Sequence, residues 1–241
     1  MVHCRLGWSE QRMVRAPDHR LDGMPVSSCG LRRLELSVAE PESSVDFFAG
    51  VLGWTVIAEP GGSFTGWVGD RLAAQVVAGE EGWRLFFGGD EPRALMANSS
   101  VDSGRVLHGP WAPPPRHGEP CWVELLTSAP DEDGAYWKRE LGWDAAEGQP
   151  GLGLYTSARH GDPRPVAGTM NSCLGAESNW SVYFAVDDIQ AACARVSELD
   201  GEVSFGPGPL PIGMIASIEG PHGGYCQLLE KPVAWGGNWS G

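Results

Sequence analysis

The sequence of 241 residues is poor in positive charge, with 17 Lys and Arg residues against 31 Asp and Glu residues and a net charge of −14. An acidic surface repels phosphate backbones and anionic lipids, so neither nucleic acid nor a membrane surface is an expected partner. No apolar run approaches the ~20 residues that a membrane-spanning helix needs. The polar, arginine-containing N-terminus lacks the apolar segment of a secretory signal, so we expect a cytoplasmic location.

The sequence also lacks paired cysteine motifs. Its six cysteines are scattered and form no C-x-x-C pair, which predicts reduced thiols rather than a disulfide framework or a zinc site. It contains no Ser/His/Asp nucleophile elbow, no phosphate-binding loop and no dinucleotide fingerprint. Nothing in the chain therefore points to the enzyme classes that these motifs mark.

What the chain does contain is an internal repeat. Residues 34–54 (LELSVAEPESSVDFFAGVLGW) align without a gap with residues 123–143 (VELLTSAPDEDGAYWKRELGW), so that Glu35 matches Glu124. Each copy predicts a strand that ends before a Pro and a helix that follows it. Acidic residues suit the first turn of this helix, and the Gly of the shared Leu-Gly-Trp motif suits a left-handed helix end.

Each copy continues with short strands. In both copies a Gly-Asp pair predicts a hairpin turn, at residues 69–70 and 161–162. Further on, WRLFFGGDE (83–91) aligns with WSVYFAVDD (180–188). Each of these segments predicts a strand whose final acidic residues can cap a helix.

The helices expected after these strands cover residues 92–100 and 189–199, and strands ending at Gly109-Pro110 and at Gly206-Pro207 would follow them. Only the second copy then continues with a hairpin pattern, at residues 212–230. We therefore expect the first copy to lack its last two strands. Residues 1–24 or a second subunit would cover the open edge, which suggests a homodimer.

These repeated modules resemble the vicinal oxygen chelate (glyoxalase/bleomycin-resistance/dioxygenase) superfamily, in its two-domain actinobacterial type. The motifs that carry the resemblance are WVELLTSAPDEDGAYWKRELGW, GDPRPVAGTM, WSVYFAVDDIQAACARVSELDGEV and GPHGGYCQLLE. The resemblance implies an α+β fold with repeated βαβββ modules, which form two such domains with curved mixed sheets, the first domain being incomplete. The expected parts are an N-terminal extension (1–24), a degenerate first domain (25–110), a Pro-rich linker (111–118) and a second domain (119–235).

The resemblance also implies where a metal would be bound, namely at a His in the first strand of each module and at a Glu in the last strand. In the second repeat these positions fall on Trp122, Ser181 and Gln227, and in the first repeat on Arg33 and Arg84. None of them is a good ligand, and guanidinium groups cannot bind a cation. We therefore expect no metal and no other cofactor.

Strand alternation predicts which side chains share a face with these positions in the second repeat. The expected neighbours are Glu124, Leu126, Tyr183 and Tyr225, and His222 lies in a Gly-rich turn at the rim. In apolar surroundings Glu124 would have a raised pKa and could exchange protons with a ligand, together with Tyr183. Its counterpart in the first repeat favours a structural role instead, so both roles stay open.

In the first repeat the same face carries Arg33, Glu35, Arg84 and Phe86. This Arg–Glu–Arg cluster suits a carboxylate or phenolate ligand, or a buried ion network without a ligand.

Eleven Trp residues suit a hydrophobic or aromatic small-molecule partner. Two functions remain. The first is a metal-independent isomerase, cyclase or lyase of natural-product biosynthesis, and the alternative is a self-resistance protein that sequesters an antibiotic without transforming it. A metal-dependent glyoxalase or dioxygenase would need ligands that the sequence does not provide.

Overall fold

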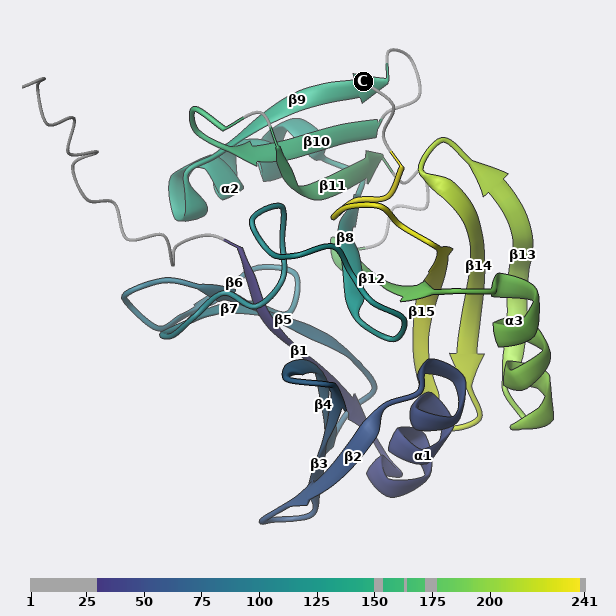
Figure 1. The fold of residues 1–241 in the computed structure, drawn as a ribbon. Helices are drawn as coiled ribbons and strands as arrows, with labels where there is room; N and C mark the ends of the chain where they lie inside the picture. The colour runs from purple at the N-terminus through teal and green to yellow at the C-terminus, as the bar shows by residue number, and fades with distance from the viewer. Residues whose placement is uncertain (1–29, 150–153, 163, 172–176, 239–241) are drawn as a thin grey trace, which may run out of the picture.

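The computed structural model describes residues 30–149, 154–162, 164–171 and 177–238, which form two mixed β-sheets and three helices (Figure 1). Three of the six cysteines and the expected N-terminal extension (1–24) lie outside these residues. Cys121, Cys193 and Cys226 are buried and free. None of the helices in the described part of the chain has the length and apolarity needed to cross a membrane.

The first sheet, sheet A, has the strand order β2-β3-β4-β1-β5-β7-β6. Its strands are β1 (Leu31–Val38), β2 (Thr55–Glu59), β3 (Ser63–Val68), β4 (Arg71–Ala78), β5 (Gly82–Gly88), β6 (Arg93–Leu95) and β7 (Ser99–Asp102). Helix α1 (Pro41–Leu52) connects β1 with β2. At the centre of the sheet, β1 pairs in parallel with β4 and antiparallel with β5.

The second sheet, sheet B, has the strand order β13-β14-β15-β12-β8-β11-β10-β9. Its strands are β8 (Pro120–Thr127), β9 (Trp143–Gln149), β10 (Leu154–Arg159), β11 (Pro165–Asn171), β12 (Asn179–Val186), β13 (Glu202–Leu210), β14 (Gly213–Gly220) and β15 (Gly223–Glu230). Helix α2 (Pro130–Leu141) follows β8, and helix α3 (Ile189–Glu198) follows β12. The order β-α-β-β-β thus occurs twice in sheet B, which confirms the expected α+β modules.

The helix ends agree with their sequence signals. Helices α1 and α2 begin at the predicted Pro residues, and each ends at a Gly in the left-handed region, with φ of 68° at Gly53 and 66° at Gly142. Only a residue without a Cβ adopts this conformation at little cost. At the start of α3, the Asp188 carboxylate accepts a hydrogen bond of 2.9 Å from the Ala191 N–H. This is the predicted acidic cap.

The helix predicted for residues 92–100 is wrong, because these residues form the hairpin of β6 and β7. Its turn contains Ala97 and Asn98 at φ of 52° and 47°. The run of good helix formers between Pro92 and Asn98 is too short for a stable helix, whereas β7 satisfies the backbone groups of β5 in a parallel pairing.

The first repeat is therefore reduced in a different way from the one expected. In the second repeat, the last strand, β15, pairs with β12. Strand β7 pairs with β5 in the same way, so the first repeat has its final strand but lacks the helix and the strand that correspond to α3 and β13. The strand expected to end at Gly109-Pro110 is also absent from the described residues, and β13 continues through Gly206-Pro207 instead of ending there. Because β6 and β7 cover the edge of β5, the open-edge argument for a homodimer loses its basis, and the homodimer stays a prediction.

Aromatic side chains form the core between the two sheets, and each repeat inserts a Phe between two Trp residues of the other repeat. The sequence alignment pairs these residues, so the contact follows an approximate two-fold relation. The ring-centroid distances are 5.6 Å for Phe184–Trp54, 5.7 Å for Phe184–Trp83, 5.2 Å for Phe87–Trp143 and 5.7 Å for Phe87–Trp180. The high Trp content, which we linked to ligand binding, is thus explained in part by this interface.

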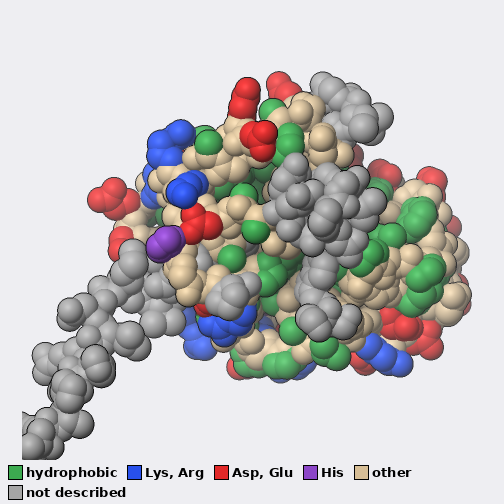
Figure 2. All heavy atoms as spheres, turned by 90° about the horizontal axis from the view of Figure 1, so that it is seen from above, with side chains coloured by type: hydrophobic (Ala, Val, Ile, Leu, Met, Phe, Trp, Pro, Cys, Tyr) green, Lys and Arg blue, Asp and Glu red, His purple; other side chains and the backbone are tan. Residues whose placement is uncertain are grey.

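The segment between the sheets is held by a buried ion cluster. Glu119 is fully buried, and its carboxylate lies 2.6 Å from Arg71 Nη2 and 2.7 Å from Arg116 Nη2. The Trp54 indole donates a hydrogen bond of 2.7 Å to the Gly118 carbonyl. These contacts fix the end of the linker before β8 begins. On the face shown in Figure 2, acidic side chains are scattered, with basic side chains among them.

We expect the acid stability of the fold to depend on His108, which is buried and donates from Nε2 to the Leu72 carbonyl at 2.8 Å. Burial lowers the pKa of His108 from 6.5 to about 4. The unfolded chain binds a proton at His108 below pH 6.5, whereas the folded chain binds one only near pH 4. The contribution of His108 to the free energy of unfolding is therefore complete above pH 6.5 and is lost as the pH falls toward 4. The expected loss is about 3 kcal/mol.

Urea unfolding as a function of pH tests this expectation. His108→Gln keeps a donor for the Leu72 carbonyl but has no titrating group, so its stability should fall less steeply with acid than that of the wild type. The exposed His222 gives the matched control His222→Gln, which should follow the wild type. Parallel curves for the wild type and His108→Gln would contradict the expectation.

Candidate functional site

The register of sheet B places the predicted residues of the second repeat on one face. Ser181 of β12 pairs with Glu124 of β8, and Tyr183 pairs with Trp122 on one side and Gln227 on the other. Paired residues and their second neighbours along a strand share a face. We name this surface the Glu124 face, and it comprises Trp122, Glu124, Leu126, Gly168, Ser181, Tyr183, Ser217, Tyr225 and Gln227.

Glu124 and Tyr183 form the centre of this face. Tyr183 Oη donates a hydrogen bond of 2.8 Å to Glu124 Oε2. Burial raises the pKa of Glu124, while the hydrogen bond from Tyr183 acts in the opposite direction. Burial and the neighbouring carboxylate also raise the pKa of Tyr183, so this phenol stays protonated and remains a donor. The pair therefore combines a carboxylate of increased proton affinity with a fixed hydrogen-bond donor.

Gly168 of β11 gives Glu124 its space. A Cβ at this position would lie 3.0 Å from Glu124 Oε1 and 3.0 Å from Trp122 Nε1. Any side chain here would clash with both groups. Because Gly168 has no side chain, Glu124 Oε1 can lie beside the backbone of β11. Sequence alternation did not single out Gly168, because a residue without a side chain contributes nothing to a hydrophobic pattern.

A second polar group adjoins this pair. Ser217 Oγ donates to Gln227 Oε1 at 2.7 Å, and Gln227 Nε2 donates to Tyr225 Oη at 3.0 Å. Tyr225 has an exposed fraction of 42%, whereas Gln227 has only 7%, so the chain of hydrogen bonds leads from the interior to the surface. The Ser181 hydroxyl is buried and has no partner among the described residues. An unsatisfied hydroxyl on this face is free to bind a polar ligand group.

The C-terminal segment covers one end of the face. The Trp235 ring lies edge-on to Trp122, with ring centroids 6.1 Å apart, and its Nε1 donates to the Val166 carbonyl at 2.9 Å. Trp235 and Ser217 were missed at the sequence level. Trp235 follows the last strand and falls outside the resemblance, although a Trp just beyond a predicted core strand was a signal that could have been used.

His222 does not join this group. It lies exposed in the turn between β14 and β15, and within the described chain no hydrogen bond or ion pair connects it to the Glu124 face. The prediction that His222 contacts a ligand has no support from its position.

In sheet A, the predicted residues of the first repeat lie together. Arg33 Nη1 is 3.0 Å from Glu35 Oε2 and donates to Gln75 Oε1 at 3.2 Å, and the Arg33 guanidinium lies 3.4 Å from the ring centroid of Phe86. Arg84 Nη2 donates to Ser100 Oγ at 2.8 Å. Arg33 thus belongs to an ion network, which is the structural alternative considered for this cluster, whereas Arg84 has no carboxylate partner in the described residues.

Glu124→Gln is expected to raise the melting temperature at neutral pH. Because burial raises the pKa of Glu124 above its ordinary 4.5, the unfolded chain ionises first, and stability falls as the pH rises from 4.5 through the folded pKa. Gln removes this charge and keeps the acceptor oxygen for Tyr183. The increase in melting temperature should vanish at about pH 4, and the exposed control Glu202→Gln should show no increase. A melting temperature for Glu124→Gln below that of the wild type at neutral pH would contradict this account.

Comparison with known proteins places the fold in a family. Residues 30–227 match the Glyoxalase/Bleomycin resistance protein/Dioxygenase superfamily. The chain belongs to this superfamily. The Mn(II)-bound glyoxalase from Novosphingobium aromaticivorans has the same fold, with a TM-score of 0.58 at 12% identity over 84% of this chain and 82% of the glyoxalase.

Two curated relatives match across most of the chain. The anthracycline biosynthesis protein DnrV of Streptomyces peucetius is 27% identical over 263 residues, covering 84% of this chain and 95% of DnrV. The anthracycline biosynthesis protein DauV of Streptomyces sp. (strain C5) is 24% identical over 256 residues, covering 83% of this chain and 93% of DauV.

The donor set of this superfamily member does not fit a divalent metal. On the Glu124 face, Glu124 is the single carboxylate and already accepts a hydrogen bond from Tyr183, Gln227 Oε1 accepts one from Ser217, and the Trp122 indole is a donor only. Within the described residues no group of three or more His, Cys, Asp or Glu side chains could hold an ion. In sheet A the guanidinium groups of Arg33 and Arg84 bring positive charge to the equivalent positions.

Proposed function

We propose that the protein acts on a hydrophobic, aromatic natural product during its biosynthesis, as a metal-independent isomerase, cyclase or lyase that transfers a proton at Glu124. The observation that carries this proposal is the partly buried Glu124 carboxylate with its raised pKa, which accepts a hydrogen bond from Tyr183 on a face that also bears Tyr225. The similarity to DnrV and DauV over most of both chains supports the biosynthetic setting.

The chemistry follows from the two carboxylate oxygens. Oε2 is bound by Tyr183, so Oε1 is the atom that takes a proton from an acidic C–H of the substrate and returns it at another carbon or oxygen. A raised pKa suits both steps, because a carboxylate of ordinary pKa takes up a proton weakly at neutral pH. The Ser181 hydroxyl and the Tyr225 phenol would bind oxygen substituents of the substrate.

A ligand panel tests this function. Polycyclic and polyketide-like aromatic compounds would be screened by quenching of Trp fluorescence, and each bound compound would be recovered and analysed by mass and by retention time against its isomers. Chelator would be present throughout. A compound returned as an isomer, cyclised product or elimination product supports the proposal, whereas unchanged recovery of every bound compound after hours contradicts it.

The second candidate is sequestration of an antibiotic without turnover. The observation that favours it is Glu35, which occupies the position of Glu124 in the first repeat and serves there in an ion pair with Arg33. A carboxylate at this position therefore has a structural role in one repeat. Tight binding with unchanged recovery would support sequestration.

A further inference from the structure

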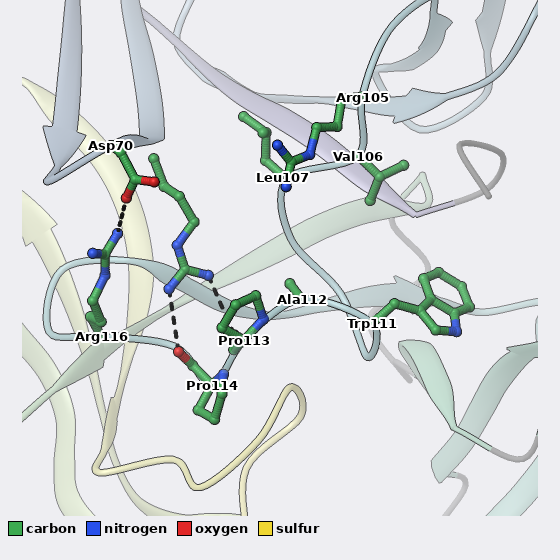
Figure 3. A pocket seen from close by; sticks show the side chains of 10 residues that line it. Asp70, Arg105, Val106, Leu107, Trp111, Ala112, Pro113, Pro114 and Arg116 are labelled. Carbon is green, nitrogen blue, oxygen red and sulfur yellow. Dashed lines mark hydrogen bonds and ion pairs between the residues drawn. The ribbon is translucent and has the colours of Figure 1, made fainter.

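A cavity of about 830 Å³ lies between the β3–β4 hairpin and the segment that joins β7 to β8 (Figure 3). None of its lining residues belongs to the Glu124 face. Its walls come from two residues at the tip of the hairpin and from two stretches of the segment between β7 and β8, the second of which belongs to the linker. The lining residues are Asp70, Arg71, Arg105, Val106, Leu107, Trp111, Ala112, Pro113, Pro114 and Arg116. A volume of this size suits a drug-sized molecule.

Three of these residues are arginines, and two of them have their charges matched. Arg71 and Arg116 both bind the buried Glu119, and Arg116 also lies 3.1 Å from Asp70. Arg105 has no hydrogen bond or ion pair with any described residue, and its guanidinium lies beside Leu107 at the cavity (Figure 3). The cavity thus carries one uncompensated positive charge in a chain whose net charge is −14.

The other walls are apolar and held in place. The Trp111 indole donates to Asp162 Oδ2 at 2.7 Å, which fixes the ring. Arg71 donates to the carbonyls of Pro113 and Pro114 at 3.3 Å each. The half-buried Leu107 completes a surface that an apolar occupant would cover. Walls that are fixed before binding lower the entropic cost of binding.

We propose that this cavity is a second ligand site, which binds an anion with a flat apolar body, such as an aromatic carboxylate or phenolate. The Arg105 guanidinium binds the anionic group with paired N–H donors, and Trp111, Leu107 and the prolines contact the apolar body. The site is separate from the proposed proton transfer at Glu124 and does not depend on it.

Isothermal titration with two probes of equal shape tests this proposal. Naphthalene-2-carboxylate carries the charge and naphthalene-2-carboxamide does not. The wild type should bind the carboxylate about tenfold more tightly, a difference of ~1.4 kcal/mol. In Arg105→Gln the preference should disappear, and in Trp111→Leu the binding of both probes should weaken. The control Arg139→Gln removes an exposed arginine on α2 and should keep the wild-type preference.

Three results would overturn the proposal. They are equal affinity of the wild type for both probes, a charge preference that persists in Arg105→Gln, and the absence of carboxylate binding by the wild type. Far-ultraviolet circular dichroism of each variant confirms that the fold is retained, which is expected for Arg105→Gln because this side chain is exposed.

Discussion

Glu124→Gln should lower turnover of the natural-product substrate by about 10²–10⁴-fold, the contribution typical of a positioned general acid–base group. The amide keeps an acceptor oxygen for the Tyr183 hydroxyl and nearly the same volume, so the affinity for the substrate should change little. Single-turnover rates and dissociation constants, measured on the same protein samples, separate these two effects.

The matched control for this prediction is Glu202→Gln, which removes an exposed carboxylate at the start of β13 and should leave both quantities unchanged. Turnover by Glu124→Gln at the wild-type rate would remove Glu124 from the chemistry. Loss of binding together with turnover would show that the carboxylate holds the ligand. The sequestering alternative predicts instead that Glu124→Gln keeps most of the affinity and that neither protein turns the ligand over.

Phe184→Ala is expected to destabilise the protein by about 3–5 kcal/mol, the usual cost of removing a buried Phe from a core. Its ring is fully buried and lies between Trp54 and Trp83 of the other repeat, so its loss leaves a cavity that rigid indole rings cannot fill. Phe87→Ala should cost a similar amount, because the approximate two-fold relation places Phe87 against Trp143 and Trp180.

Urea unfolding measures these losses, and Phe205 offers a matched control. Phe205 has an exposed fraction of 52%, so Phe205→Ala should change the free energy of unfolding by no more than about 0.5 kcal/mol. A separate early transition that involves only one sheet would show that the two repeats unfold independently. That result would contradict the view that the aromatic contacts join them into one cooperative unit.

The regular parts of the fold could be predicted because local signals agree with the tertiary structure there. The Pro and Leu-Gly-Trp motifs mark both ends of α1 and α2, and Asp188 marks the start of α3. The alternation of side chains along β8, β12 and β15 placed Glu124, Tyr183 and Gln227 on one face before their pairing was known.

The sequence-based predictions were wrong or incomplete where non-local contacts determine the structure. The run of good helix formers within residues 92–100 is short, and these residues form a hairpin because β7 pairs with β5. The sequence could not show that Trp54 and Trp143 pack between the repeats, because a periodic pattern does not reveal which surfaces meet. Gly168 lies against Glu124 of the neighbouring strand, and sequence alternation alone does not reveal this contact.

Turnover after removal of metal ions shows whether proton transfer at Glu124 proceeds without a metal. The protein would be dialysed against chelator, its metal content measured, and turnover of a compound from the ligand panel followed in chelator and after the addition of Mn²⁺, Fe²⁺ or Zn²⁺. We expect undiminished turnover in chelator and no increase on addition of any of these ions. Activity that is lost in chelator and restored by one divalent ion would contradict this expectation.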